Sequence, residues 1–579
     1  MSRVRPAPAL LLATLTIYSC TGTPAIPYDI VLRGGTVYDG SGEPPFLGDV
    51  AIAADRIVAV GDLGDAVADE EIDVAGLAVA PGFVNMLSWA TDSLIVDGRS
   101  QGDIRQGVTL EVFGEGSSYG PLNEGMKADA LANWIAGGGG EAAVREMLGL
   151  AAGSRVEVPW TTLGEYLSFL ENKGVAPNVA SFVGATTLRV HVLGYEDRAP
   201  TSEELVQMQE LTRAAMREGA MGVGSSLIYA PAFYADTDEL VAIAAAAGEY
   251  GGMYISHMRS EGNRLIEAVD ELITVARDAG VAAEIYHLKA GGQANWPKMA
   301  IAIDRVEAAR AEGLAITADM YTYTAGSTGL DAAMPPWAQE GGYTEWRERL
   351  RDADTRRRVR EEMTTPTDEW ENLLLAAGAE GTLLVGFRNA ELRRQYTGKT
   401  LAAVAAERGQ HPADTAIDLV IEDGTRVQVV YFLMSEDNIE LQIKRPWVSL
   451  GSDAGSLATE GRFILTSTHP RAYGNFSRLL GRYVRERGVI SLEEAVRKLA
   501  ALPSENLGIV GRGRLQAGYF ADLAIFDPDT IADHATYENP HQYATGMVHV
   551  FVNGQQVLRD GEHTGALPGR AIYGPGHPD

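Results

Sequence analysis

The stretch GMYISHMRSEGNRLIEAVDELITVARDAGVAAEIYH (residues 252–287) has a short apolar segment at each end and a helical pattern between them. Apolar side chains recur at helical spacing from residue 264 onward, and this pattern ends at Gly280, a residue that commonly terminates helices. A strand, a helix and a second strand in this order are typical of a parallel sheet with helical crossovers. The stretch therefore predicts an α/β fold.

The same alternation continues through the middle of the chain. Eight short apolar segments are candidates for parallel strands, namely FVNML (83–87), VTLEVF (108–113), NVASFVG (178–184), MGVGSS (221–226), GMYISH (252–257), AAEIYH (282–287), AITADMY (315–321) and WVSLGSD (447–453). Eight strand–helix units predict a (β/α)8 TIM-like barrel. Between the last two candidates, residues 330–445 approximately are rich in charge and helical periodicity, which predicts a helical insertion over the mouth of the barrel.

Both ends of the barrel region are flanked by segments that alternate apolar and polar residues around Gly-rich turns. These segments are YDIVLRGGTVYDG (28–40) and GDVAIAADRIVAVGDL (48–63) on one side, and GYFADLAIFDPD (518–529) and MVHVFVNGQQVL (547–558) on the other. Such patterns are typical of antiparallel strands. We expect residues 26–80 and 508–579 to form one small β-sandwich, with the barrel domain of residues 81–507 inserted between them.

The first 25 residues, MSRVRPAPALLLATLTIYSCTGTPA, combine two arginines, a short apolar run and small residues. This pattern is typical of a secretory signal and predicts an exported, periplasmic protein. The only cysteine of the chain, Cys20, stands where bacterial lipoprotein signals carry the lipidated cysteine. We therefore expect membrane attachment through Cys20, with an ordinary cleaved signal as the alternative.

The composition restricts the partners of the protein. A net charge of −30, from 48 basic and 78 acidic side chains, disfavours nucleic acid and anionic lipid surfaces, because both require neutralising Lys and Arg. With 46% apolar residues in 579, the chain can bury a large core. A small-molecule substrate is the expected partner, and the oligomeric state is left open.

Four reactive side chains follow predicted strands: Glu115 in FGEG, His257 in YISH, His287 in IYH and Asp453 in GSD. Since barrels gather catalytic groups at the carboxyl ends of their strands, we expect these four to meet. Two histidines and a carboxylate are an established set of catalytic zinc ligands, so Glu115, His257 and His287 predict one Zn²⁺. Asp453 is then the predicted acid–base residue that takes a proton from water and passes it to the leaving amine. The alternative for each histidine is a hydrogen-bonded structural role.

Ordered motifs extend this pattern from about residue 28 to the C-terminus: VLRGGTVYDGSGEPPFLGDVAI, VAPGF, RQGVT, SLIYAPAFYADTDEL, YISHMRSEG, YHLKAGG, ADMYTYTAGSTGL, MSEDNIE, GSDAG and HPRAYGNFSRLLGRYVRE. With these motifs the chain resembles the N-acyl-D-amino-acid deacylases (D-aminoacylases) of the amidohydrolase superfamily. The resemblance implies a zinc-dependent hydrolase of N-acyl amino acids, in which His257, His287 and Asp453 match the tight-site histidines and the catalytic aspartate. It further implies that the substrate carboxylate is held by Tyr229, Lys289, Tyr321 and Ser327, with Arg259 nearby.

The chain departs from the family pattern at three places. In PGFVNMLSWATD (81–92), Leu87 and Trp89 stand where the superfamily carries two metal-binding histidines, so a second metal held by that pair is not expected. The family's bridging cysteine is absent from GEGS (114–117), and we expect Glu115, one position away, to take its place. After the third strand GATT (184–187) replaces a GHG motif; His191 lies beyond it and is expected to be structural or to line the pocket, with a substitute metal ligand as the alternative.

The sequence as a whole favours a metal-dependent hydrolase that cleaves the amide bond of N-acyl amino acids, or of small peptide-like amides, with Leu87 and Trp89 as walls of an apolar acyl pocket. Two alternatives stay open. One is a hydrolase of a cyclic amide or another carboxylic derivative, and the other is a noncatalytic binding lipoprotein on an amidohydrolase scaffold. The acyl group, the amino-acid side chain and the preference for D or L substrates are not determined by the sequence.

Overall fold

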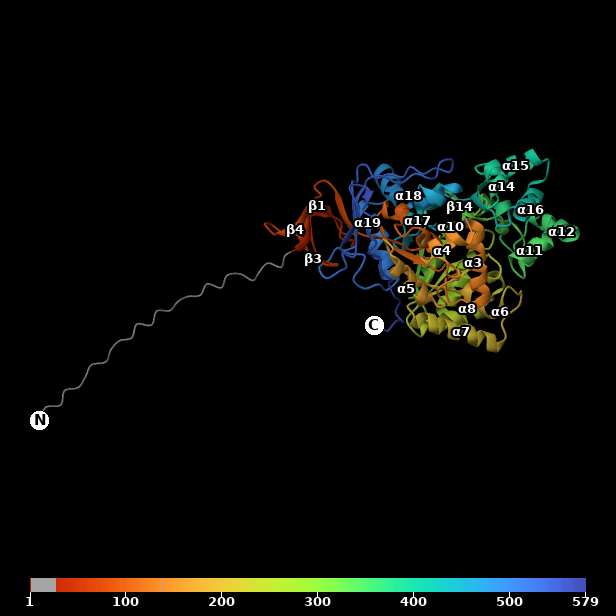
Figure 1. Ribbon diagram of the computed structural model, residues 1–579, viewed down its shortest axis with the longest axis horizontal. Helices are drawn as coiled ribbons and strands as arrows, with labels where there is room; N and C mark the ends of the chain where they lie inside the picture. Colours follow the sequence, from red (N-terminus) through yellow and green to blue (C-terminus); the bar gives the residue numbers. More distant parts are fainter. Residues whose placement is uncertain (2–27, 139, 579) are drawn as a thin grey trace.

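The computed structural model describes residue 1, residues 28–138 and residues 140–578 of the chain (Figure 1). Apart from Met1, the predicted signal segment lies outside the described residues, and so does Cys20, so export and lipidation stay predictions. No helix within the described part of the chain has the length and apolar character needed to cross a membrane.

Each of the eight predicted strand segments contains a parallel strand. The strands are β6 (Phe83–Asn85), β7 (Val108–Phe113), β8 (Asn178–Ser181) with β9 (Val183–Gly184), β10 (Gly222–Ser226), β11 (Met253–His257), β12 (Ala283–Ile285), β13 (Ile316–Met320) and β17 (Val448–Leu450). They pair in two parallel sheets, in the orders β6-β7-β8 and β9-β10-β11-β12-β13-β17. Backbone hydrogen bonds join the two sheets at both junctions, from Met86 N to Leu450 O at 3.2 Å and from Met221 N to Ser181 O at 2.9 Å. The predicted α/β fold is confirmed.

Amphipathic helices connect these strands. The main ones are α5 (Leu163–Lys173), α7 (Ser202–Arg217), α8 (Thr237–Gly248), α9 (Leu265–Ala279) and α10 (Lys298–Ala311). The predicted helix between β11 and β12 is α9, which buries one face that includes Leu272 and Ile273 and ends at Gly280. Gly280 has a φ of +70°, a left-handed conformation that glycine adopts without steric cost, and its N–H bonds the carbonyl of Ala276. The helix therefore ends where the sequence predicts it.

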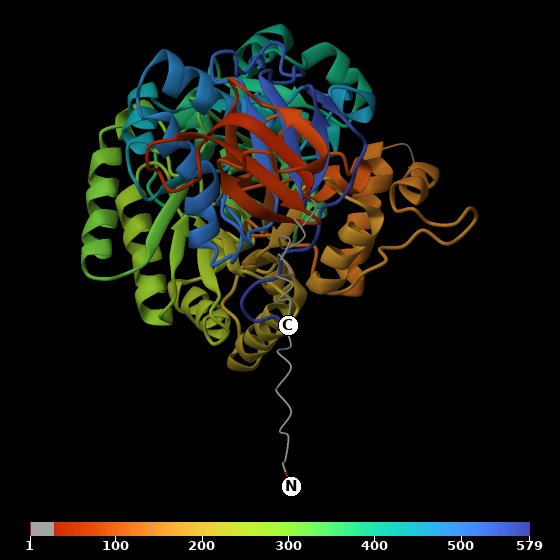
Figure 2. The same cartoon turned by 90° about the vertical axis from the view of Figure 1, so that its left-hand side faces the viewer.

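The two terminal segments share one nine-stranded sheet. It contains β1 (Tyr28–Val37), β2 (Phe46–Ala53), β3 (Arg56–Gly61), β4 (Ala68–Asp73), β5 (Ala78–Pro81), β18 (Leu523–Phe526), β19 (Met547–Val552), β20 (Gln555–Arg559) and β21 (Glu562–His563). Antiparallel pairing of β5 with β18 joins the N-terminal and C-terminal groups of strands, and Figure 2 shows the red and blue strands side by side. The two terminal segments thus share one sheet, whereas the β-sandwich of residues 26–80 and 508–579 and the barrel domain of residues 81–507 stay predictions.

The insertion between β13 and β17 lies at the opposite end of the molecule from the terminal sheet (Figure 1). Its helices are α11 (Tyr343–Arg351), α12 (Ala353–Met363), α13 (Leu373–Ala377), α14 (Ala390–Tyr396), α15 (Leu401–Arg408) and α16 (Pro412–Asp423). The prediction of a purely helical insertion was incomplete, because β14 (Ala325–Gly329), β15 (Thr382–Gly386) and β16 (Gln428–Phe432) form an antiparallel sheet. These strands are short, and β14 consists of small residues without an apolar alternation, so the sequence pattern did not show them.

A buried carboxyl group within the parallel strands makes the stability of the fold depend on pH. Glu284 of β12 is fully buried and accepts hydrogen bonds from Thr317 Oγ1 at 2.6 Å and Asn506 Nδ2 at 3.1 Å. Burial nevertheless raises the pKa of Glu284 to about 7, above the roughly 4.3 of an unfolded chain. The folded state thus binds more protons than the unfolded state between these values, and stability is lost as the pH rises through 7.

We expect Glu284→Gln, which stays neutral, to be more stable than the wild type at pH 8 by roughly 2–3 kcal/mol and to differ little from it at pH 5. Thermal unfolding across this pH range measures the difference. The exposed Glu312→Gln is a matched control that should show no such gap. If Glu284→Gln were more stable than the wild type by the same amount at pH 5 and pH 8, ionisation of Glu284 would not be the cause of the difference.

Candidate active site

The four predicted reactive residues lie at the carboxyl ends of the parallel strands. Glu115 follows β7, His257 ends β11, His287 follows β12 and Asp453 follows β17. His287 and Asp453 have φ angles of +35° and +48°, which non-glycine residues rarely adopt and which occur preferentially at functional sites. Their backbone N–H groups are held by Asp319 Oδ1 and Leu87 O, each at 2.9 Å. The strand ends therefore hold both residues in strained backbone conformations, and these conformations fix the directions of the two side chains.

Glu115, His257 and His287 come together as predicted. Glu115 Oε1 lies 3.1 Å from His257 Nδ1 and 3.0 Å from His287 Nε2, and these two nitrogens are 2.9 Å apart. All three side chains are buried. Within the described residues, this is the one group of His, Cys, Asp and Glu side chains whose donor atoms converge closely enough to hold a metal. Ligands placed tetrahedrally at the usual zinc distances would be roughly 3.3 Å apart, so the three donors fit such an ion.

The electrostatic field at this cluster favours a cation. Burial opposes charge on Glu115, but His287 and His257 hold the pKa of this carboxyl well below its usual range. Burial and Lys289 likewise oppose charge on His287, yet Glu261, Glu115 and Asp453 together raise its pKa to about 10. The same negative groups that hold this proton would also attract a divalent cation, and binding of the cation would displace the proton from the histidine.

Glu261 supports both histidines and was missed by the sequence analysis. Its Oε1 lies 2.9 Å from His287 Nδ1 and accepts a hydrogen bond of 2.5 Å from Lys289 Nζ, and its Oε2 is 3.7 Å from His257 Nε2. Lys289 Nζ is also 2.6 Å from His287 Nδ1, but an ammonium group only donates, so a protonated Nδ1 pairs with Glu261. The spacing of four residues from His257 in YISHMRSEG is the signal that could have identified Glu261.

Asp453 stands beside this cluster and forms an ion pair with Arg471, whose Nη1 lies 2.8 Å from Asp453 Oδ2. Arg471 is the first residue of α18 (Arg471–Arg478) and is buried. Burial raises the pKa of Asp453, and Arg471 opposes this rise. Arg471 was not singled out in the sequence, although it lies in the HPRAYG motif.

Trp89 and Leu87, which occupy the usual histidine positions, have different environments. Leu87 is fully buried in the core and is not among the residues that line the cavity, so its prediction as a wall of an acyl pocket was wrong. Trp89 does line the cavity, and the residue is 39% exposed. Its indole Nε1 donates a hydrogen bond of 2.8 Å to Glu115 Oε2. Trp89 is therefore in contact with a candidate metal ligand.

The cavity above these groups has a volume of about 500 Å³ and is lined by four of the predicted substrate ligands, Tyr229, Lys289, Tyr321 and Ser327. Tyr321 Oη is buried, and none of the described residues forms a hydrogen bond with it. Tyr229 Oη donates to Thr328 Oγ1 at 2.9 Å, and Ser327 Oγ donates to Val429 O at 2.9 Å. Arg426 of the insertion also lines the cavity, next to the Tyr229 ring. These residues combine hydroxyl groups with three cationic groups, Lys289, Arg426 and Arg471, in one enclosed space.

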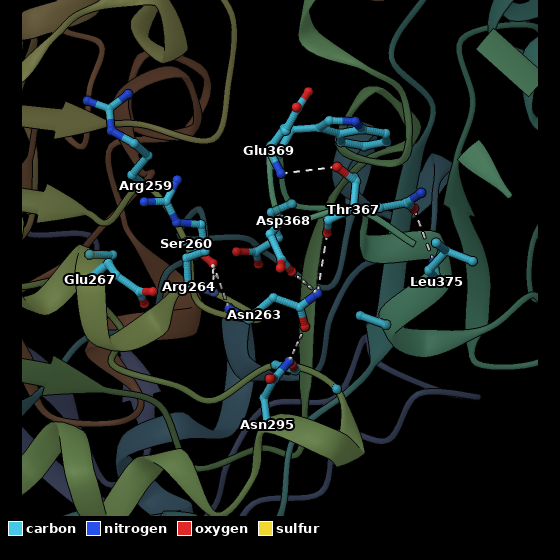
Figure 3. Close-up of a pocket in the computed structure, with 18 of the residues that line it drawn as sticks. Arg259, Ser260, Asn263, Arg264, Glu267, Asn295, Thr367, Asp368, Glu369 and Leu375 are labelled. Atoms are coloured by element: carbon cyan, nitrogen blue, oxygen red, sulfur yellow. Dashed lines mark hydrogen bonds between the residues drawn. The ribbon is translucent and has the colours of Figure 1, made fainter. Parts of the chain in front are cut away.

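Two predicted substrate ligands lie elsewhere. Arg259 donates to Glu271 Oε2 at 2.9 Å and to the carbonyl oxygens of Phe233 and Ala235. It lines a separate cavity of about 820 Å³, in which Figure 3 shows it with Arg264, Asn263 and Thr367. His191 on α6 (Ala185–Leu193) places Nδ1 3.3 Å from Pro121 O and does not line the active-site cavity. No contact in the structure supports a substrate role for either residue, so both roles stay predictions.

The larger cavity contains none of the candidate metal ligands. The smaller one brings together the histidine pair, Glu115, Asp453 and the cationic groups, and is therefore the candidate active site.

We expect Glu261→Gln to weaken metal binding about 10–100-fold, because an amide is a poorer acceptor for His287 Nδ1 and leaves Lys289 without its counter-charge. Competition with a chromogenic chelator measures the dissociation constant. Glu271→Gln, which alters a carboxylate paired with Arg259 at 2.9 Å, is the matched control and should bind metal normally. Unchanged affinity in a folded Glu261→Gln protein would show that Glu261 does not support the ligands.

Comparison with known proteins identifies relatives that span nearly the whole chain. The amidohydrolase family model matches residues 132–558. The D-aminoacylase of Alcaligenes xylosoxydans xylosoxydans is 34% identical over 547 residues, which cover 94% of this chain and 98% of that protein.

Two solved structures are similar over the same range. A D-aminoacylase studied for its binuclear metal centre, with one-metal activation and second-metal attenuation, has a TM-score of 0.76 at 32% identity and covers 94% of this chain and 100% of that one. The N-acyl-D-glutamate deacylase of Bordetella bronchiseptica, complexed with zinc and a phosphonate mimic of the tetrahedral intermediate, has a TM-score of 0.74 at 27% identity with the same coverage. The α/β fold of this chain matches these structures.

Proposed function

The chain belongs to the amidohydrolase family, and we propose that it is a metal-dependent hydrolase that cleaves the amide bond of N-acyl-D-amino acids. The observation that carries this proposal is the convergence of Glu115, His257 and His287 next to Asp453, in a cavity with cationic groups. The similar proteins are D-aminoacylase and N-acyl-D-glutamate deacylase, which supports the D configuration of the substrate.

We propose one Zn²⁺ held by Glu115, His257 and His287, since the donor set and the separations of the donor atoms fit this ion. When bound, the ion supplies an acidified water and polarises the scissile carbonyl group. Two further features of the proposal concern the fold. The hydrogen bonds at both sheet junctions support a closed eight-stranded barrel, and the shared terminal sheet supports the β-sandwich.

The residues of the chain supply the proton transfers. Asp453 accepts a proton from the attacking water and later donates it to the amine nitrogen as the amide C–N bond breaks. Its burial raises its pKa, which makes the carboxylate a better base than an exposed aspartate. Arg471, paired with Asp453 Oδ2, fixes the orientation of that carboxylate.

The cationic side of the cavity accounts for recognition of a free carboxylate. Lys289, Tyr321 and Arg471 line one cavity, and among the residues that the structure describes the hydroxyl of Tyr321 has no hydrogen-bond partner. Charge-assisted hydrogen bonds from Lys and Arg to a carboxylate are among the strongest polar contacts in proteins. These groups would hold the carboxylate of the amino acid, while Ser327 and Tyr229 line the remaining wall.

We also propose, from the sequence alone, that the protein is exported to the periplasm and attached to the membrane through a lipid on Cys20. The substrate would then be a small molecule encountered outside the cytoplasm.

The proposed function is tested by hydrolysis of matched N-acetyl-D- and N-acetyl-L-amino acids. We expect hydrolysis of the D member, loss of activity after chelation and recovery with zinc. Elemental analysis should find about one zinc per chain in the wild type and less in Glu115→Ala. Preferential hydrolysis of the L member, or full activity in metal-depleted protein, would contradict the proposal.

In the same assay we expect Asp453→Asn to lower kcat about 10²–10⁴-fold without changing the zinc content. Asp533→Asn is a matched control, because Asp533 pairs with Arg478 at 2.9 Å outside the cavity and should not affect kcat. Retained turnover in Asp453→Asn would exclude its acid–base role.

A further inference from the structure

Two of the carboxylate groups around the histidine pair, those of Glu115 and Asp453, each have one oxygen within 2.8 Å of a side-chain nitrogen. Trp89 Nε1 donates to Glu115 Oε2 at 2.8 Å, and Arg471 Nη1 lies 2.8 Å from Asp453 Oδ2. The other oxygen of Glu115, Oε1, faces both histidines. The two oxygens of Glu115 are therefore in different environments, one beside imidazole nitrogens and the other beside an indole.

Neither nitrogen donor can itself bind a metal. An indole N–H only donates and offers no lone pair, and a guanidinium group keeps its proton under all ordinary conditions. A carboxylate that bridges two metal ions through both of its oxygens must direct a lone pair of each oxygen at an ion. The hydrogen bond from Trp89 Nε1 to Oε2 opposes this bridging mode at Glu115 and leaves Oε1 as the oxygen that faces the histidine pair.

The backbone places Trp89 for this contact. Its N–H bonds the carbonyl of Ala454, next to Asp453, at 2.9 Å, and the preceding Ser88 N–H bonds the carbonyl of Val112 on β7 at 2.9 Å. Trp89 is thus anchored between the strand ends that carry Glu115 and Asp453. The residue Trp89 is 39% exposed, whereas Glu115 is only 4% exposed. A large aromatic side chain that is not buried and yet bonds a buried carboxylate is poorly explained by packing.

From these contacts we infer that Trp89 is a positioning residue that turns Glu115 Oε1 toward the histidine pair, and that it keeps a second metal ion from binding at Glu115 Oε2. Arg471 contributes by occupying Asp453 Oδ2. This inference rests on the proposed function, since it requires an ion between Glu115, His257 and His287. The indole at position 89 therefore makes the centre mononuclear.

The test compares metal binding by the wild type, Trp89→Phe and Trp89→His. Each metal-free protein is given excess zinc chloride, passed through a desalting column and measured by elemental analysis. Affinity is obtained by chelator competition, and the visible spectrum of the cobalt-loaded protein reports the coordination geometry. Trp337→Phe is the matched control, because Trp337 Nε1 also donates to a carboxylate, Glu362 Oε2, at 2.7 Å, but outside the site.

We expect one zinc in the wild type even at excess. Trp89→Phe keeps the aromatic wall but removes the N–H, so it should bind metal about 10–100-fold more weakly and change the cobalt spectrum, while Trp337→Phe should do neither. Trp89→His frees Oε2 and adds a lone pair, so it should take up a second zinc.

Two zinc ions in the wild type, unchanged affinity and spectrum in Trp89→Phe, or a single zinc in Trp89→His would each overturn the inference. The wild-type measurement and Trp89→His keep the test decisive if Trp89→Phe does not fold. A wild type that binds no zinc would overturn the proposed function itself, which separates the two failures.

Discussion

The interaction on which the site depends is the buried negative charge of Glu115 between two imidazole rings. A carboxylate at this depth is stable only if positive or hydrogen-bonding groups surround it, and here His257, His287 and Trp89 all contact it. A second buried carboxylate, that of Glu261, contacts His287 from the other side and is also paired with Lys289. The site thus contains alternating negative and positive groups, and removing His257 or His287 takes away one of the contacts that stabilise the buried Glu115 carboxylate.

Most of the architecture was predictable because the parallel strands and their helices carry strong periodic patterns. The histidines and Glu115 were predictable for the same reason, since each follows a recognisable strand. Arg471 and the indole of Trp89 were not, because their roles arise from contacts between segments far apart in the sequence, and Glu261 was missed although it stands four residues after His257. Arg259 shows the converse: the family resemblance placed it near the substrate carboxylate, yet its guanidinium is paired with Glu271. Proximity in sequence to a site residue does not determine the direction of a side chain.

The insertion was the least predictable part of the fold. Residues 325–329 and 428–432 form two antiparallel strands that are about a hundred positions apart in the sequence. A local sequence pattern does not predict a pairing over this distance. The helices of the insertion were visible from their charge and periodicity. The position of Ser327 in β14 follows from this pairing, so its environment could not be derived from the barrel pattern alone.

The insertion has a consequence for how this chain can diversify. Ser327, Gln428, Tyr431 and Arg426 belong to the insertion and line the cavity, whereas Glu115, His257, His287 and Asp453 stand on the parallel strands. The candidate reactive groups and part of the cavity wall thereby belong to two parts of the chain with separate hydrophobic cores. Substitutions in the insertion can therefore change this wall of the cavity without displacing the side chains at the strand ends. The same hydrolysis reaction can in this way be combined with substrates of different shape.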